Sequence, residues 1–262
     1  MQFRTSITAR SWNNVGRSLA LAGACLALPL LLAGSDKNAK PKEVPGQMVD
    51  SGSFGVFMNG RRVASETFSI QQDNSGSVIK SEFKTDAGTD TAGQSSELQL
   101  TAGAELKNYE WKETSPGQSQ AVVAPNQEFL IEHFSSSPQE KQHAQTFLLP
   151  ASTSILDDYF FVHREVLAWK YLASSCKQDH GQLACPLKQA AQFGTLNAHT
   201  RASTLVSVQF SGRERISLHG TDRELIRLDM KSENGDWTLW LDDQLKVQRI
   251  LDPTSNTEVI RD

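Results

Sequence analysis

Residues 154–173, SILDDYFFVHREVLAWKYLA, decide the fold, because they form the one long amphipathic segment in a chain that otherwise alternates like strands. Their apolar residues recur at helical spacing: Ile155, Tyr159, Val162, Val166, Trp169 and Ala173. We therefore predict a helix over residues 154–173, with Ser154 as its N-cap and Asp157 near its positive end. A stripe this wide needs a large apolar partner, and a β-sheet is the partner that the rest of the sequence offers.

Short alternating segments separated by turn residues lie on both sides of this predicted helix. Phe54, Val56 and Met58 alternate and lead into Asn59-Gly60, a strong signal for a tight β-hairpin. Residues 73–76 (DNSG) and 234–235 (NG) supply further turns. Neighbouring strands joined by turns this short pair antiparallel.

Many strands carry an apolar residue on their second face as well as on the first: Phe57, Leu130, Leu205, Leu225 and Trp240. A strongly curved sheet explains this pattern, because part of one face packs on the helix while the curvature encloses a pocket. We predict a mainly β fold, a curved antiparallel sheet (half-open barrel) packed on one long α-helix. The alternative is a closed barrel or a two-sheet sandwich whose second-face residues contact loops.

The N-terminal region has the organisation of a signal peptide. Residues 1–17 carry arginines and no acidic residue, residues 19–33 are apolar (LALAGACLALPLLLA), and Gly34 and Ser35 are small. We predict a signal peptide over residues 1–35, a flexible linker over 36–50 and a single β-rich domain over 51–262, in a periplasmic or secreted protein. The alternative is an uncleaved N-terminal membrane anchor. Lipidation at Cys25 is disfavoured, because apolar residues follow it where a mature polar chain should begin.

The charge of the chain excludes some partners. The sequence has 26 basic and 30 acidic residues, and the predicted signal peptide holds three of the basic residues and none of the acidic ones. The mature protein is therefore acidic, which argues against nucleic acid as a partner and against simple electrostatic binding to anionic membranes.

Cys176 and Cys185 are the cysteines that remain outside the signal peptide, and they flank a polar loop, KQDHGQLA. Two cysteines that bracket a turn in an exported chain are typical of a disulfide. The alternative is a metal site formed by Cys176, Asp179, His180 and Cys185. Zinc-binding cysteines are usually closer together than this pair, which favours the disulfide.

No motif predicts catalysis, a metal site or a cofactor, and we expect neither a metal nor a cofactor. The histidines are dispersed, and the sequence contains no nucleophile elbow, phosphate loop or dinucleotide fingerprint. We interpret Asp157-Asp158 as a helix start and Asp242-Asp243 as a hairpin turn. A Ser/His/Asp triad assembled from distant positions has no sequence signal and stays open.

Apolar residues on a second sheet face are what a lipid-type pocket requires. The candidate ligand-binding residues are Trp111, Leu130, Leu205, Leu225 and Trp240.

The layout resembles a group of uncharacterised bacterial exported β-rich envelope proteins. The residues that carry the resemblance are Asn59-Gly60 with Phe68 and Ile70, Leu149-Pro150 before Leu156-Asp157, and Trp240-Leu241-Asp242 with Val247. The group is more distantly similar to the periplasmic lipoprotein-localisation carriers, in which a curved antiparallel sheet closed by helices holds acyl chains. The resemblance implies an acyl-type ligand. The single long helix here departs from the several helices of the carriers.

Three hypotheses on function follow. The first is non-catalytic binding of an apolar or lipid-like envelope component in the concavity of the sheet. The second is an envelope scaffold or protein-interaction module, whose concavity is filled by its own side chains and whose edge strand recruits a protein partner. The third is a hydrolase with a dispersed triad.

Overall fold

The computed structural model describes residues 46–86, 91–179 and 182–262. This part of the chain is mainly β, with one large sheet, one α-helix and a small two-stranded sheet. The elements are β1 (Gln47–Met58), β2 (Arg61–Asp73), β3 (Gly76–Thr85), β4 (Gly93–Thr101), β5 (Leu106–Ser115), β6 (Gln120–Asn126), β7 (Phe129–Ser135), β8 (His143–Phe147), β9 (Ser154–Ile155), α1 (Val162–Ser175), β10 (Lys177–Asp179), β11 (Gln182–Ala184), β12 (Ala190–Asn197), β13 (Ala202–Leu218), β14 (Thr221–Ser232), β15 (Gly235–Leu241), β16 (Val247–Asp252) and β17 (Thr257–Arg261).

The large sheet has 15 strands in the order β8-β7-β6-β5-β4-β3-β2-β1-β17-β16-β15-β14-β13-β12-β9. Two runs of consecutive hairpins therefore meet where β1 pairs with β17. The pairings are antiparallel as predicted, except that β9 runs parallel to β12. Within the described residues the edge strands β8 and β9 do not pair with each other, so the sheet is not closed into a barrel.

The predicted hairpin at Asn59-Gly60 is confirmed. Asn59 (φ 51°) and Gly60 (φ 75°) both have positive φ, as the tight turn that joins β1 to β2 requires. His219 (φ 49°) and Gly220 (φ 75°) form a similar turn between β13 and β14, which was not predicted from the sequence. In both turns glycine takes the second position without the cost that a side chain would bring.

The helix is shorter than predicted and begins later. α1 starts at Val162 and not at residue 154, and Ser154 is not its N-cap. Ser154 and Ile155 instead form β9 and pair with Thr195 and Leu196 of β12. The residue that precedes the helix, Phe161, provides no side-chain cap. The apolar positions before Val162 therefore belong to an extended segment that continues the sheet.

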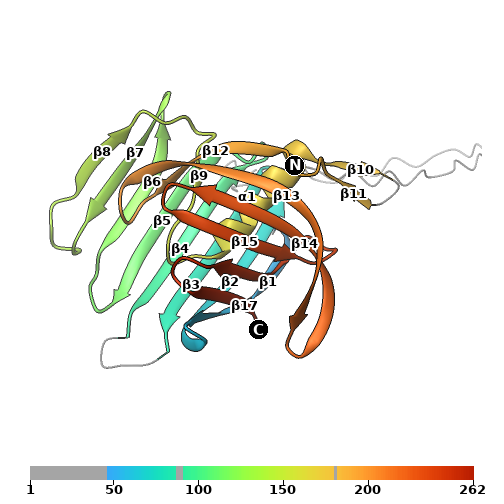
Figure 1. Ribbon diagram of the computed structural model, residues 1–262. Coiled ribbons are helices and arrows are strands. Elements are labelled where there is room, and N and C mark those ends of the chain that lie inside the picture. The colour runs from blue at the N-terminus through green and yellow to red at the C-terminus, as the bar shows by residue number, and fades with distance from the viewer. Residues whose placement is uncertain (1–45, 87–90, 180–181) are drawn as a thin grey trace, which may run out of the picture. The chain divides into compact units, whose positions relative to one another are not determined.

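Figure 1 shows α1 between the blue-to-green strands and the orange-to-red strands of the same sheet. Hydrogen bonds and ring contacts agree with this view, because α1 contacts both runs of strands. The His163 ring lies 5.4 Å from the ring of Tyr109 in β5, and the Trp169 indole donates to the carbonyl oxygen of Leu245 between β15 and β16 at 2.6 Å. Buried side chains from both runs and from the helix form one hydrophobic core.

Buried carboxylates from the sheet and the helix also fix α1. Glu66 in β2 is fully buried, and its carboxylate accepts hydrogen bonds from the backbone N–H groups of Phe161 (2.7 Å) and Val162 (3.3 Å) and from the Ser81 hydroxyl (2.6 Å). A residue of another element thus supplies the cap that the helix lacks locally. On the helix itself, the Glu165 carboxylate accepts from the backbone N–H of Val247 at 3.1 Å.

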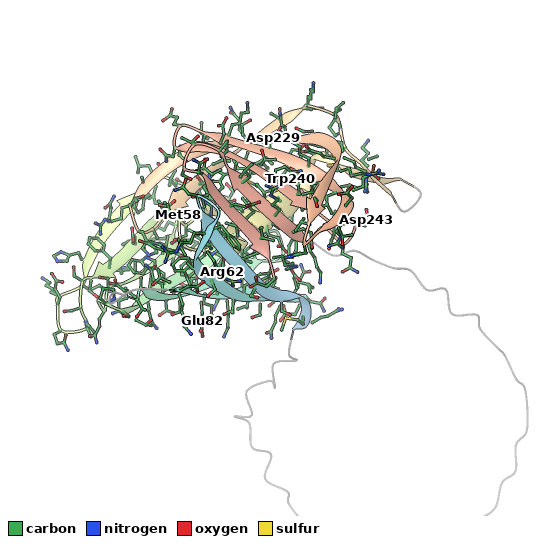
Figure 2. The ribbon with its side chains drawn as sticks, turned by 60° about the horizontal axis from the view of Figure 1, so that its bottom comes forward. Met58, Arg62, Glu82, Asp229, Trp240 and Asp243 are labelled. Carbon is green, nitrogen blue, oxygen red and sulfur yellow. A yellow bond between two sulfur atoms is a disulfide. The ribbon has the colours of Figure 1, made fainter. Side chains whose placement is uncertain are left out.

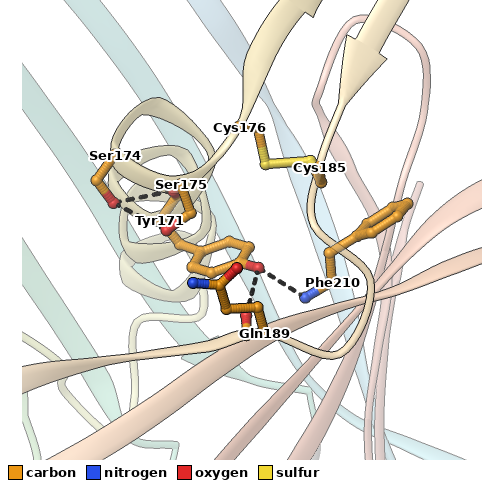
Figure 3. Close-up of a disulfide and its surroundings, with 7 residues drawn as sticks. All are labelled: Tyr171, Ser174, Ser175, Cys176, Cys185, Gln189 and Phe210. Atoms are coloured by element: carbon orange, nitrogen blue, oxygen red, sulfur yellow. Dashed lines mark hydrogen bonds between the residues drawn. A yellow bond between two sulfur atoms is a disulfide. The ribbon is translucent and has the colours of Figure 1, made fainter.

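The predicted disulfide between Cys176 and Cys185 is confirmed, and it joins the C-terminal end of α1 to the segment before β12. Figure 3 shows the neighbouring Tyr171, whose hydroxyl accepts from the Phe210 N–H at 2.9 Å and donates to the Gln189 carbonyl at 3.1 Å. Because the disulfide uses both sulfur atoms, the alternative of a metal site at these cysteines is wrong.

Replacing both cysteines with serine is expected to lower the free energy of unfolding by about 2–3 kcal/mol, the value that chain entropy gives for closing so short a loop. Equilibrium urea denaturation of the oxidised protein and of the double variant measures the difference. Equal stabilities would show that the bond constrains neither the folded nor the unfolded chain.

The predicted boundary between linker and domain needs correction. Strand β1 begins at Gln47, which pairs with Gln72 of β2, so residues 47–50 belong to the sheet and not to a linker. The predicted signal peptide and residues 36–45 of the predicted linker lie outside the described residues. No helix in the described part of the chain is long and apolar enough to cross a bilayer.

Candidate functional site

Asp157 is the centre of a polar site buried among the segment before α1, strands β4 and β5, and the turn between β12 and β13. Its side chain is fully buried. One carboxylate oxygen accepts from the Tyr109 hydroxyl at 2.7 Å and lies 2.6 Å from Nδ1 of His199. The other accepts from the Tyr159 backbone N–H at 3.0 Å. The prediction that Asp157 lies at the start of the helix is therefore wrong. Asp157 instead joins three separate parts of the chain.

The charges around Asp157 favour its ionised form. Burial alone would raise the pKa of this carboxyl, but the hydrogen bond and charge of His199 hold it below its usual value. Burial, together with the negative charge of Asp157, raises the pKa of Tyr109 well above its usual value. The Tyr109 hydroxyl thus remains protonated and acts as a donor to Asp157.

His199 is held on both sides of its ring. Nε2 lies 2.6 Å from Oε1 of Gln94, and the ring stacks on the indole of Trp111 with centroids 3.8 Å apart. In this orientation Nδ1 faces the Asp157 carboxylate and Nε2 faces the Gln94 side-chain oxygen, so the ring is held between two oxygen atoms.

A carboxylate–histidine pair is also the core of many hydrolytic triads, in which the second ring nitrogen faces a hydroxyl or thiol nucleophile. Here that nitrogen faces the Gln94 amide, which cannot act as such a nucleophile. The arrangement instead fixes the β12–β13 turn over Trp111. The geometry thus gives no support to the hydrolase hypothesis.

A second group of residues lies under the same turn. Glu132 of β7 lies two positions from Leu130 and from Phe134, so all three side chains are on the same face of the sheet. Leu130 and Phe134 both pack on the main core. Arg201, in the turn, places its guanidinium 4.2 Å from the centroid of the Phe134 ring. We call this region of β5–β7 the turn-covered face. It comprises Trp111, Ala121, Val123, Leu130, Glu132 and Phe134.

Glu132 is an unusual member of this apolar face. Its side chain is fully buried, and neither carboxylate oxygen has a hydrogen-bond partner among the described residues. Burial raises its pKa to about 7, and the nearby charge of Arg201 offsets part of that rise. An ionised carboxylate without partners is costly in such a place, so the protonated form is favoured.

Replacing Glu132 with glutamine is expected to stabilise the protein at about pH 8, by roughly 1–3 kcal/mol, and to change little at about pH 4.5. In the wild type the pKa of Glu132 is raised from its usual 4.5 to about 7 in the folded state. The free energy of unfolding is therefore highest below pH 4.5 and falls as the pH rises through about 7. Glutamine does not ionise and avoids this loss. Thermal denaturation across this pH range measures the effect.

The control for this variant is Glu128→Gln, because Glu128 is exposed in the turn before β7. We expect no pH-dependent difference between Glu128→Gln and the wild type. A destabilised Glu132→Gln protein at alkaline pH would show that the carboxylate has partners in the folded state.

The five ligand-binding residues predicted from sequence do not come together. Trp111 and Leu130 lie on the turn-covered face within the main core. Leu225 and Trp240 belong to a separate small cluster with Ile216 and Leu218, and Leu205 is 61% exposed. Trp240, labelled in Figure 2, donates its indole N–H to Glu214 at 2.9 Å and is covered by Arg249. Only Trp111 and Leu130 therefore remain candidates for one common site.

Sequence reasoning missed most of the polar residues of the site. Glu132 had a usable signal, since strand alternation puts it in line with Leu130 and Phe134 on an apolar face. Gln94 and His199 had no such signal, because they are 105 positions apart and meet through the β12–β13 turn.

A shallow hollow of about 500 Å³ lies on the opposite face of β2–β5, and most of the residues that line it are polar or charged. Its lining includes Lys80, Glu82, Glu97, Glu110 and Lys112, and Figure 2 labels Glu82 on this side. Lys80 pairs with Glu97 at 3.1 Å and Lys112 with Glu110 at 2.8 Å. Neighbouring opposite charges of this kind are typical of a solvated sheet face.

Comparisons with known proteins give no family assignment. No protein-family model and no curated protein matches the chain. Among solved structures, a DUF1089 family protein from Pseudomonas aeruginosa is similar, with 9% sequence identity and a TM-score of 0.39. The match covers 70% of this chain and 86% of that protein. A similarity this low assigns neither a fold family nor a function.

Proposed function

We propose that the protein is an exported, non-catalytic binding protein that takes an apolar or lipid-like component of the cell envelope on its turn-covered face. The observation that carries the proposal is that a turn, and not a helix, lies over Trp111 and Phe134 on this face. The β12–β13 turn contacts Trp111 through His199 and Phe134 through Arg201, and His143 of β8 also stacks on the Phe134 ring, with centroids 5.6 Å apart. A turn held by side chains can move with a smaller loss of packing than a helix docked in the core.

The turn-covered face has the chemistry that an acyl chain requires. Ala121, Val123 and Leu130 are buried and apolar, and Trp111 and Phe134 add aromatic surface at the side where the turn lies. Mostly apolar surface with a few polar groups that fix orientation is typical of small-molecule sites. In this proposal the large sheet acts as a half-open barrel, and the predicted resemblance to acyl carriers points to the same ligand class.

We also propose that the protein is exported to the periplasm or the cell exterior. This proposal rests on the basic and apolar N-terminal sequence, which predicts a signal peptide. The Cys176–Cys185 disulfide supports an oxidising compartment such as the periplasm or the cell exterior.

Native mass spectrometry of the protein isolated from its own compartment, before and after solvent extraction, tests the proposal. We expect a bound species of lipid mass that extraction removes. A bare polypeptide mass in every preparation, together with no uptake of added fatty alcohol, would contradict the proposal.

A scaffold function is the second candidate, and a specific observation favours it. The face of the sheet that packs on the main core is filled by the protein's own side chains, since Tyr109, Val123 and Leu130 are all fully buried. In this case the edge strand β8, followed by Leu148 (81% exposed), is available to pair with a strand of another protein. The bare polypeptide mass described above is the result that a scaffold predicts.

A further inference from the structure

The turn-covered face carries an ionisable group that an acyl chain does not explain. Glu132 is fully buried in line with the core residue Leu130, and in the part of the chain that the structure describes neither of its carboxylate oxygens is hydrogen bonded. A buried carboxylate without partners costs free energy that a hydrogen-bond donor or a cation would recover. The protein thus retains a negative or proton-accepting group at a position where an apolar side chain would pack without cost.

The residues beside Glu132 show which kind of group fits there. Phe134, two positions along the same strand face, presents its aromatic ring, and the Arg201 guanidinium already lies 4.2 Å from the ring centroid. A carboxylate next to an aromatic face is the combination that binds ammonium and guanidinium groups. Arg201 itself is exposed and lies in a turn, so a competing cation can displace it more readily than a buried residue.

We infer that Glu132 and Phe134 form a binding site for the primary ammonium head group of an amphiphile, and that Arg201 occupies this site while no ligand is bound. The inference rests on the proposed function, because the alkyl chain of the amphiphile would lie on the turn-covered face. The ammonium group donates hydrogen bonds to the free oxygens of Glu132 and lies against Phe134. Arg201 moves out into solvent when the ligand binds.

Isothermal titration of the purified, oxidised protein tests the inference with three probes. They are n-decylammonium below its critical micelle concentration, n-decanol below its solubility limit, and ethylammonium. We expect decylammonium to bind about tenfold more tightly than decanol, because it adds a charge-assisted hydrogen bond and a cation–π contact.

Variants of Glu132 and Phe134 should weaken the preference for decylammonium over decanol, whereas a variant of Arg201 should strengthen decylammonium binding. Glu132→Gln is expected to remove most of the preference for decylammonium over decanol, and Phe134→Leu to reduce it while keeping the apolar contact. Arg201→Ala is expected to strengthen decylammonium binding about threefold or more, because it removes the competing cation. Glu128→Gln, the exposed control, should leave all affinities unchanged.

An unchanged preference in Glu132→Gln, or equal binding of decylammonium and decanol by the wild type, would overturn the ammonium site and leave the proposed function standing. Weaker decylammonium binding by Arg201→Ala would overturn the role of Arg201 as the displaced occupant. Ethylammonium binding as tight as that of decylammonium would support the ammonium site and contradict the apolar part of the proposed function. Binding of none of the three probes would overturn both.

Discussion

Replacing Asp157 with alanine is expected to lower the free energy of unfolding by about 3–5 kcal/mol, because it leaves several buried donors without an acceptor. The Tyr109 hydroxyl, His199 and the Tyr159 backbone N–H all lose the carboxylate that they now share. Equilibrium urea denaturation near neutral pH measures the loss.

The adjacent residue provides a matched control. Asp158 is exposed, and its carboxylate accepts one hydrogen bond from the Asn197 amide at 2.7 Å. We expect Asp158→Ala to cost less than about 1 kcal/mol, as is usual for exposed polar contacts. Similar losses in the two variants would contradict the description of Asp157 as the buried centre of the site.

Replacing Glu66 with alanine is expected to cost about 2–4 kcal/mol, because the first N–H groups of α1 and the Ser81 hydroxyl would be buried without an acceptor. Burial raises the pKa of Glu66 to about 7, even though these hydrogen bonds favour its ionised form. The stability that protonated Glu66 contributes is therefore full below its usual pKa of 4.5 and is lost as the pH rises through about 7. Denaturation at several pH values measures the cost and its pH dependence.

Glu82→Ala is the control for Glu66, because Glu82 lies on the neighbouring strand β3 and points away from the core. Its removal should change stability by less than about 0.5 kcal/mol. A Glu66→Ala protein as stable as Glu82→Ala would show that α1 does not depend on a carboxylate from the sheet.

Local features could be predicted from sequence because they depend on residues close in the chain. The Asn59-Gly60 hairpin follows from the positive φ that its turn requires, and the Cys176–Cys185 disulfide closes a short loop. The general fold class, an antiparallel sheet with one helix, follows from hydrophobic periodicity in the same way.

The start of the helix could not be predicted because partners far away in the sequence determine it. Ile155 fits a helical stripe by spacing, but it pairs with Leu196 of β12 in a parallel ladder. The N–H groups that a local cap would satisfy are bound by Glu66, 95 positions before Phe161. Tertiary pairing thus overrides helix periodicity over residues 154–161.

The face that each half of β13 presents to the core could not be predicted for a different reason. Strict alternation puts Val206, Val208, Ile216 and Leu218 on one face of β13. A register shift between Phe210 and Gly212 reverses the faces, so that Val206 and Val208 join the main core, whereas Ile216 and Leu218 join the separate cluster with Trp240. A bulge of this kind has no clear sequence signal. Leu225 and Trp240 reach the same separate cluster by plain alternation, because they lie on the faces of β14 and β15 opposite Ile226 and Leu239.

His163 of α1 is a further buried titratable residue, with an exposed fraction of 1%. Both ring nitrogens are buried without a hydrogen-bond partner in residues 46–86, 91–179 and 182–262, and burial lowers its pKa to about 4. Its neutral form therefore contributes stability above its usual pKa of 6.5, and this contribution is lost as the pH falls through about 4. The pH dependence of His163 is opposite to that of Glu66 and Glu132, so their combined effect favours maximal stability between the two limits.

Tryptophan quenching by a brominated fatty alcohol tests the central claim most directly, because a bromine atom quenches only indoles that it touches. Trp111 lies on the turn-covered face, whereas Trp240 belongs to the separate cluster of Ile216, Leu218 and Leu225. If an apolar chain binds on the turn-covered face, the quenching should be lost in Trp111→Phe and retained in Trp240→Phe. Quenching that persists in Trp111→Phe and disappears in Trp240→Phe would contradict the claim, as would an absence of quenching in the wild type.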